Sequence, residues 1–210
     1  GLSAPPEPFV PEEHHLAPVY AFVIVGFGAA EAHAALIEPV RQAVPPLVEL
    51  VTPMPYTALQ QMFNDSAPWG ILAYEKAVYL DELSDDAIEV ILEQQPKKAF
   101  PLSFLPIFVL GGAYSRVDDD ATGFGGSRKH TYIVNIPAAA PTPEIYEAER
   151  EWVRTFWSAL APHAPGVGSY VNFMTDPDED RVRAAYGPRK YERLARLKAE
   201  YDPDNVFHLN

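Results

Sequence analysis

The chain has 210 residues, of which 48% are hydrophobic and 21% are charged, and it carries a formal net charge of −13. This size fits one domain with a substantial core, and the composition excludes general disorder. The acidic balance argues against nucleic acid and anionic membranes as partners, and the absence of cysteine excludes disulfides, thiolate metal sites and a cysteine nucleophile.

The start of the chain, residues 1–18, is rich in proline and is predicted to be irregular. It has neither an initiator Met nor the basic-then-apolar pattern of a signal peptide, so we expect a cut or processed end. The longest apolar run, Val19–Val25, is too short to span a bilayer. These features favour a cytoplasmic protein with no membrane partner, although the localisation is otherwise left open.

Val19–Val25 is predicted to be a buried strand because it is β-branched and aromatic. Gly26-Phe27-Gly28 follows, and then an alanine-rich helix over Ala29–Ala43 that is expected to break at Pro39. The order of a strand, a G-x-G motif and a helix suggests a dinucleotide-binding unit. In such a unit an acidic residue binds the ribose, and Glu49 lies near the expected position of that residue. The third glycine is missing and an acid lies near the helix start, so a glycine-permitted turn is favoured.

The remaining elements alternate between strands and helices. Predicted strands are Leu47–Thr52, Trp69–Tyr79, Leu102–Leu110 and Tyr132–Ile136, and predicted helices are Pro55–Phe63, Asp85–Gln95 with Ser84 as its cap, and Pro143–Leu160. Strands that recur singly between helices can form βαβ units, so an α/β fold is one alternative.

Few residues suggest a catalytic or metal site of their own. His14 and His15 are adjacent and point apart in an extended chain, which disfavours a metal site. Asp118–Asp120 lacks the glycine and the distal glutamate of a calcium loop, and no serine lies in a G-x-S-x-G motif. We therefore expect no metal and no hydrolase chemistry.

The tail of the chain has a distinctive order of parts. Tyr170, Asn172 and Met174 alternate, which predicts an extended segment with these side chains on one side. A helix is predicted to begin at Pro188 and to run to Tyr201, where Asp202-Pro-Asp-Asn stops it.

This order, Y-x-N-F and then Y-G-x-x-x-Y-x-x-L-x-x-L-K-x-x-Y-D-P-x-N-x-F over Tyr170–Phe207, resembles the C-terminal signature of the berberine-bridge-enzyme-like flavoproteins. These are FAD-linked oxidases of the vanillyl-alcohol-oxidase type. The resemblance implies an α+β fold, with helices on one face of an antiparallel sheet and the flavin under the open face. It implies a substrate-binding or cap domain over residues 1–165, a C-terminal segment over 166–210, and an FAD-binding domain that this chain lacks.

The resemblance also implies the site residues. Tyr170 and Asn172 are expected beside the flavin ring, where the Asn172 amide offers a donor and an acceptor. Tyr170 is a candidate catalytic base, provided that its surroundings lower a pKa that is about 10 for free tyrosine. On the strands, Tyr74 and Lys76 share one face and are expected to bind substrate.

Tyr132 and Asn135 are further substrate-binding candidates, but they lie three residues apart and face opposite sides, so at most one of them is correct. The sequence also departs from the family pattern. Relatives carry an F-x-H-R unit where this chain has Phe124-Gly-Gly126-Ser-Arg128, so glycine replaces the histidine and the arginine is displaced.

The function implied is oxidation of a small organic molecule, such as an alcohol, a sugar or an aromatic natural product, by hydride transfer to FAD with dioxygen as acceptor. The chain alone is not expected to be active, because its FAD-binding domain or subunit is missing. The alternatives are a non-catalytic ligand-binding or interaction domain, or one half of a two-chain flavoenzyme. The sequence leaves the substrate, the oligomeric state and the mode of FAD attachment undetermined.

Overall fold

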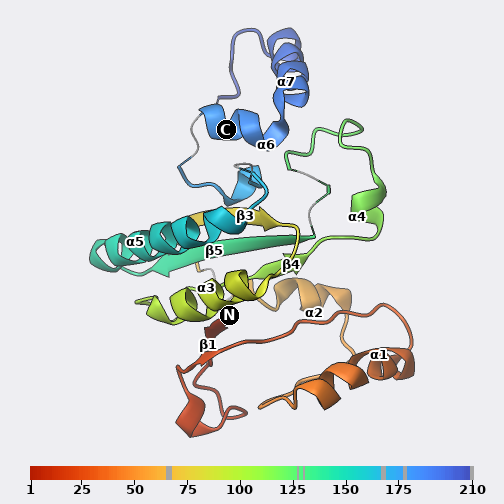
Figure 1. Cartoon of the computed structure of the whole chain (residues 1–210), viewed down its shortest axis with the longest axis vertical. Helices are drawn as coiled ribbons and strands as arrows, with labels where there is room; N and C mark the ends of the chain where they lie inside the picture. The colour runs from red at the N-terminus through yellow and green to blue at the C-terminus, as the bar shows by residue number, and fades with distance from the viewer. Residues whose placement is uncertain (65–67, 127, 130, 167–168, 177–178, 209–210) are drawn as a thin grey trace. The chain divides into compact units, whose positions relative to one another are not determined.

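The computed structural model describes residues 1–64, 68–126, 128–129, 131–166, 169–176 and 179–208. The chain divides into two compact units, Gly1–Ile71 and Leu72–Asn210. Figure 1 draws the first unit in red and orange and the second from yellow to blue.

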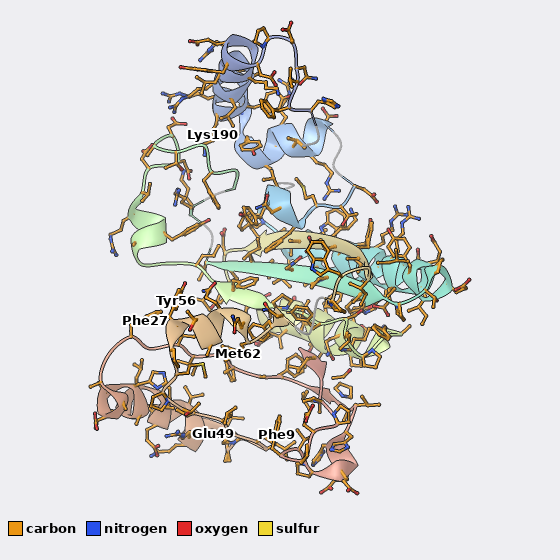
Figure 2. The ribbon with its side chains drawn as sticks, turned by 180° about the vertical axis from the view of Figure 1, so that it is seen from behind. Phe9, Phe27, Glu49, Tyr56, Met62 and Lys190 are labelled. Atoms are coloured by element: carbon orange, nitrogen blue, oxygen red, sulfur yellow. The ribbon has the colours of Figure 1, made fainter. Side chains whose placement is uncertain are left out.

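The first unit contains little regular structure. Strand β1 (Leu2–Ser3) pairs antiparallel with β2 (Pro18–Val19), a short 3-10 turn η1 covers Glu12–His14, and two helices follow, α1 (Ala30–Ala43) and α2 (Tyr56–Gln61). The rings of Phe27 and Tyr56 lie 6.4 Å apart, and both residues are labelled in Figure 2.

Two predicted strands of this unit are wrong. Of Val19–Val25 only Val19 lies in a strand, and Phe22 and Val23 are 78% and 62% exposed. Leu47–Thr52 forms no strand either. A β-branched or aromatic run becomes a strand only where a neighbouring strand pairs with it. Within the described part of this unit the one pairing ends at Val19.

The helix prediction for this unit needs one correction, because α1 continues through Pro39 instead of breaking there. Proline removes one hydrogen bond, and the alanines of α1 favour the helix enough to tolerate it. The dinucleotide-binding alternative lacks its strand before Gly26. Its acid, Glu49, which is labelled in Figure 2, accepts two hydrogen bonds from Arg41, at 2.6 and 2.5 Å.

The second unit is built on a three-stranded sheet in the order β3-β5-β4, with β3 over Leu72–Leu80, β4 over Ile107–Val109 and β5 over Tyr132–Ala140. Strands β3 and β5 pair along their full length, from Leu72 opposite Ala140 to Leu80 opposite Tyr132. Every pairing is antiparallel, so the α+β fold class is confirmed and the parallel α/β alternative is wrong.

Two helices cover one face of this sheet. Helix α5 (Pro143–Leu160) packs across β3 and β5, and α3 (Asp85–Gln94) packs against α5 (Figure 1). Between the two helices, Trp152 Nε1 donates to the Gln94 carbonyl at 2.8 Å. Ser84 caps α3 as predicted, because its hydroxyl oxygen accepts from Ala87 N at 3.3 Å. The core between helices and sheet consists of Tyr74, Val78, Leu80, Ile91, Leu105, Val134, Ile136, Ala138, Trp152, Val153, Phe156 and Leu160.

The predicted strand over Leu102–Leu110 is correct only for Ile107–Val109. Pro106 has no N–H to give to a ladder, and the preceding residues form a loop around the buried carboxylate of Glu149 instead. The remaining short elements of this part are η3 (Gln95–Lys97), α4 (Ala113–Arg116) and η4 (Ala161–His163).

The tail forms a 3-10 turn η5 (Val171–Phe173) and two helices, α6 (Glu179–Tyr186) and α7 (Pro188–Tyr201). The predicted extended segment is therefore wrong at η5, because Phe173 N donates to the Tyr170 carbonyl at 2.9 Å and closes a turn. The predicted helix from Pro188 to Tyr201 is confirmed. Among the described residues no helix has the length and apolar character needed to cross a membrane.

Candidate functional site

The sheet of the second unit presents two faces with different coverings. Because side chains alternate along a strand, the register puts Tyr74 and Val78 on one face and Ala77 and Asn135 on the other. The first face packs against α5. We call the second the open face; it carries Ala73, Glu75, Ala77 and Tyr79 from β3, Phe108 from β4, and Ile133, Asn135, Pro137 and Ala139 from β5.

Four rings, which we call the aromatic cluster, lie over one part of the open face: Tyr114, Phe124, Tyr170 and Phe173. Tyr170 stacks on Phe124 with centroids 5.5 Å apart and meets Phe173 edge-on at 5.0 Å. Phe173 in turn stacks on Phe108 at 6.1 Å, and Tyr114 meets Phe124 edge-on at 5.6 Å. The C-terminal segment therefore places its aromatic residues on the open face.

Tyr79, at 4% exposure, lies under this cluster and donates a hydrogen bond to the hydroxyl of Tyr114. Burial raises the pKa of both hydroxyls above the ordinary tyrosine value, so both stay protonated near neutral pH. Gly126 approaches closely, with φ at 143°, and a Cβ there would lie 2.2 Å from the Tyr79 hydroxyl. A histidine at position 126 does not fit while Tyr79 keeps this place, and Ser127 of the same unit lies outside the described residues.

A carboxylate and an amide meet on another part of the open face. Asn135 Nδ2 donates to Glu75 Oε2 at 3.0 Å, and Asn135 is only 4% exposed. Its Oδ1 is buried and accepts no hydrogen bond from any described residue. Burial raises the pKa of the Glu75 carboxyl, and the hydrogen bond from Asn135 opposes that rise.

The segment 169–176 is fastened along the free edge of β3. The Ser169 hydroxyl donates to the Ala77 carbonyl at 2.9 Å. Further along, Thr175 bonds Glu75 twice: its N donates to the Glu75 carbonyl at 3.2 Å, and its hydroxyl accepts from Glu75 N at 2.8 Å. These bonds fix both Tyr170 and the backbone of Glu75.

Helix α7 holds the loop that supplies Phe124. Lys190, labelled in Figure 2, is 6% exposed and donates from Nζ to the Phe124 carbonyl at 2.8 Å. Arg193 donates to the Asp120 carbonyl at 2.9 Å, and Arg189 forms an ion pair with the Asp120 carboxylate, also at 2.9 Å. The C-terminal helix thereby positions a ring of the aromatic cluster.

Three of the predicted site residues meet on or over the open face. Tyr170 belongs to the aromatic cluster and accepts a hydrogen bond from Asn172 Nδ2 at 2.8 Å. Asn172 is exposed, and Asn135 lies on the strand face below. The prediction that Tyr132 and Asn135 face opposite sides is confirmed, because Tyr132 packs with the core under α5.

The other predicted pair, Tyr74 and Lys76, shares a strand face as expected, but α5 covers that face. Tyr74 is 1% exposed; its hydroxyl donates to Asp176 Oδ2 at 2.9 Å and accepts from Arg154 Nε at 3.1 Å. Lys76 Nζ lies 4.8 Å from the centre of the Trp157 ring. In this structure both side chains contact the helix side of the sheet.

Sequence reasoning missed Glu75, Tyr79 and Tyr114. Alternation in the strand Leu72–Leu80 separates Glu75 and Tyr79 from Tyr74 and Lys76, but it does not say which set faces the helix. The resemblance drew attention to the Tyr-x-Lys set. Tyr114 had no signal, since it comes from the four-residue helix α4.

Three comparisons with known proteins bear on the identity of this site. Residues 169–210 match the family model described as berberine and berberine like. An FAD-linked oxidoreductase of Dictyostelium discoideum is 26% identical over 185 residues, which cover 87% of this chain and 40% of that protein. A berberine bridge enzyme-like protein of Nicotiana tabacum is 26% identical over 149 residues, covering 56% of this chain and 26% of that one.

Solved structures show the same fold. Physcomitrella patens BBE-like 1 matches with a TM-score of 0.69 at 18% identity, over 86% of this chain and 41% of that chain. A glycopeptide hexose oxidase in complex with teicoplanin matches with a TM-score of 0.62 at 24% identity, over 86% and 39%. The chain is thus similar to berberine-bridge-enzyme-like and FAD-linked oxidoreductases, as its tail predicted, and the matches span about two-fifths of the Dictyostelium discoideum and Physcomitrella patens proteins.

The Dictyostelium discoideum relative is named as FAD-linked, and the open face of this chain has residues that suit a flavin ring. The aromatic cluster offers a flat apolar contact, and the exposed amide of Asn172 offers a donor and an acceptor for the polar edge. The Asn135 Oδ1, which lacks a donor among the described residues, is a further acceptor on this face. These groups fit the flat ring and polar edge of a flavin.

Proposed function

We propose that this chain provides the substrate-binding face and the C-terminal segment of an FAD-linked oxidoreductase. The enzyme oxidises a small organic molecule, an alcohol, a sugar or an aromatic natural product, with dioxygen as the final electron acceptor. One observation carries the proposal: the segment that matches the berberine-like family is fastened along β3 and sets Tyr170 over the open face.

Each part of the chain has a role in this proposal. Residues 1–165 form the substrate-binding or cap domain, and residues 166–210 form the C-terminal segment that shapes the open face. Tyr170 and Asn172 contact the flavin ring, and Asn135 contacts the substrate. For Tyr74, Lys76 and Tyr132 we propose that they support the sheet from behind, since they lie on the face that α5 covers.

When bound, FAD acts as the two-electron oxidant and accepts a hydride from the substrate. The residues of this chain bind and orient the substrate, and the aromatic cluster excludes water from one side of the site. We propose that the phosphates of FAD are held mainly by a domain or subunit other than these 210 residues. FAD would then bind only weakly to the chain alone.

The test begins with the purified chain. FAD added at 50 µM is expected to separate from it on gel filtration, and co-elution of flavin absorbance at 450 nm would contradict the proposed division of roles. The protein expressed with FAD from its genomic coding region is then mixed anaerobically with benzyl alcohol or cellobiose. Bleaching at 450 nm, followed by hydrogen peroxide release on exposure to air, supports the proposal. Bleaching without peroxide would refute dioxygen as acceptor.

A further inference from the structure

The open face carries one carboxylate that neither the family resemblance nor the comparisons assign. The structure describes every residue of β3, β4 and β5, and among the side chains that these strands place on the open face only Glu75 is acidic. The backbone N–H of Glu75 donates a hydrogen bond to the Thr175 hydroxyl, and its carboxylate accepts a hydrogen bond from the Asn135 amide. The group is therefore held in place from two directions.

The bonding around this carboxylate is incomplete. Oε2 of Glu75 accepts from Asn135 Nδ2 at 3.0 Å. On the neighbouring strand the Oδ1 of Asn135 is buried and lacks a donor among the described residues. A buried carbonyl oxygen without a donor is energetically unfavourable, so its presence on this face points to a ligand that donates hydrogen bonds.

We propose that Glu75 is the proton acceptor of the oxidation, and that Asn135 orients its carboxylate and binds the substrate. This rests on the proposed function above. The substrate hydroxyl donates to Glu75; as the alcohol is oxidised, its O–H proton passes to the carboxylate and a C=O double bond forms. The C–H bond at the same carbon would break with its electron pair staying on the hydrogen, and FAD held beside Tyr170 and Asn172 would supply the two-electron oxidant that accepts this hydride.

The environment of Glu75 suits this role better than that of Tyr170. Burial raises the pKa of the Glu75 carboxyl, which makes its ionised form a stronger base, and general-base catalysis contributes about 10²–10⁴-fold. The Tyr170 hydroxyl is engaged by Asn172 at 2.8 Å. A tyrosine also needs a large fall from its ordinary pKa of about 10 before it accepts protons at neutral pH.

Three variants test the proposal. Glu75→Gln keeps the size of the side chain and an oxygen that accepts from Asn135, but it cannot take up the proton. Glu75→Asp keeps a shortened base. Glu89→Gln is the matched control, because Glu89 is an exposed carboxylate of α3 in the same unit. Far-ultraviolet circular dichroism checks that all three fold.

The first readout needs no flavin. In the chain labelled with [5-¹³C]glutamate, the carboxyl signal that Glu75→Gln removes is expected to titrate at higher pH than free glutamate does, and Glu89→Gln is expected to leave this signal in place. Titration of this signal at the pH of free glutamate would contradict the partly buried position of the Glu75 carboxyl.

The second readout is the rate of anaerobic flavin bleaching by benzyl alcohol or cellobiose in the FAD-loaded protein. Glu75→Gln is expected to slow bleaching about 10²–10⁴-fold and Glu75→Asp less, with Glu89→Gln unchanged. A Glu75→Gln rate within about threefold of the wild-type rate would overturn the role of Glu75. Bleaching of the wild-type protein tests the proposed function itself, so the two failures are distinguishable.

Discussion

Replacing Glu149 tests how strongly buried hydrogen bonds stabilise the face of the sheet that α5 covers. This residue of α5 is fully buried, and its carboxylate accepts hydrogen bonds from the backbone N–H groups of Ala99 and Phe100 and from the hydroxyl of Ser103. The Ser103 oxygen in turn accepts from Ala139 N at 3.0 Å. One carboxylate thus ties the loop before β4 to both α5 and β5.

The expected cost of Glu149→Ala follows from these bonds. Three donors lose their acceptor, of which the Ser103 hydroxyl is fully buried. Each unsatisfied donor costs about 1–3 kcal/mol, partly relieved where water enters. The change also removes the negative charge that acts on Lys98, whose pKa burial already lowers to about 8. We expect the free energy of unfolding to fall by about 3–5 kcal/mol, and by about 1–3 kcal/mol for Glu149→Gln, which keeps an accepting oxygen.

Urea unfolding followed by tryptophan fluorescence measures this loss, because Trp152 and Trp157 both lie on α5 within the packed unit. Glu147→Ala is the matched control on the same helix. The Glu147 side chain is 67% exposed and meets only Arg150 at 3.4 Å, so a change below about 0.5 kcal/mol is expected. A loss smaller than about 1 kcal/mol for Glu149→Ala would refute the bonding argument.

Other changes test the open face and its supports. Gly126→Ala is expected to lower the unfolding free energy by about 2–4 kcal/mol, because it strains the backbone and its Cβ clashes with the Tyr79 hydroxyl. Gly111→Ala is the control, since a Cβ there meets nothing within 4 Å and is expected to have little effect on packing. Thermal melts compare the two variants. Lys190→Met is expected to cost about 1 kcal/mol and to speed thermolysin cleavage; unchanged cleavage would show that this contact does not hold the loop. A hydrogen bond from a tyrosine hydroxyl lowers the pKa of the Asp176 carboxyl. The ionised Asp176 therefore stabilises the fold above the unfolded-state pKa of about 3.9, and this stabilisation is lost as the pH falls through the lower folded value. In Asp176→Asn the free energy of unfolding is expected to fall less on acidification, by about a few tenths of a kcal/mol. An unchanged dependence of stability on acid pH would count against this.

The elements that the sequence predicts best are those whose signals are local. The apolar stripe of Pro143–Leu160, the Ser84 cap of the helix that begins at Asp85, and the proline and Asp-Pro stop of Pro188–Tyr201 gave correct helices, because caps and helical spacing act within a few residues. Val19–Val25 was predicted wrongly because a strand needs a partner, and composition alone does not supply one.

The site was predictable only in part, for the same reason. The family motif identifies Tyr170 and Asn172, and the alternation rule correctly separates Tyr132 from Asn135. Neither rule says which face of β3 a helix covers. The identity of the covered face decides whether the side chain of Glu75 or that of Tyr74 faces the site. That information lies in the packing of α5 against β3, which joins residues far apart in the sequence.

Sequencing the coding DNA immediately ahead of the Gly1 codon decides whether this chain works as the substrate side of an FAD-linked oxidoreductase. We expect an open reading frame that continues into a glycine-rich, flavin-phosphate-binding sequence. A start codon directly ahead of Gly1, with no gene for a flavin-binding partner beside it, would rule out this role.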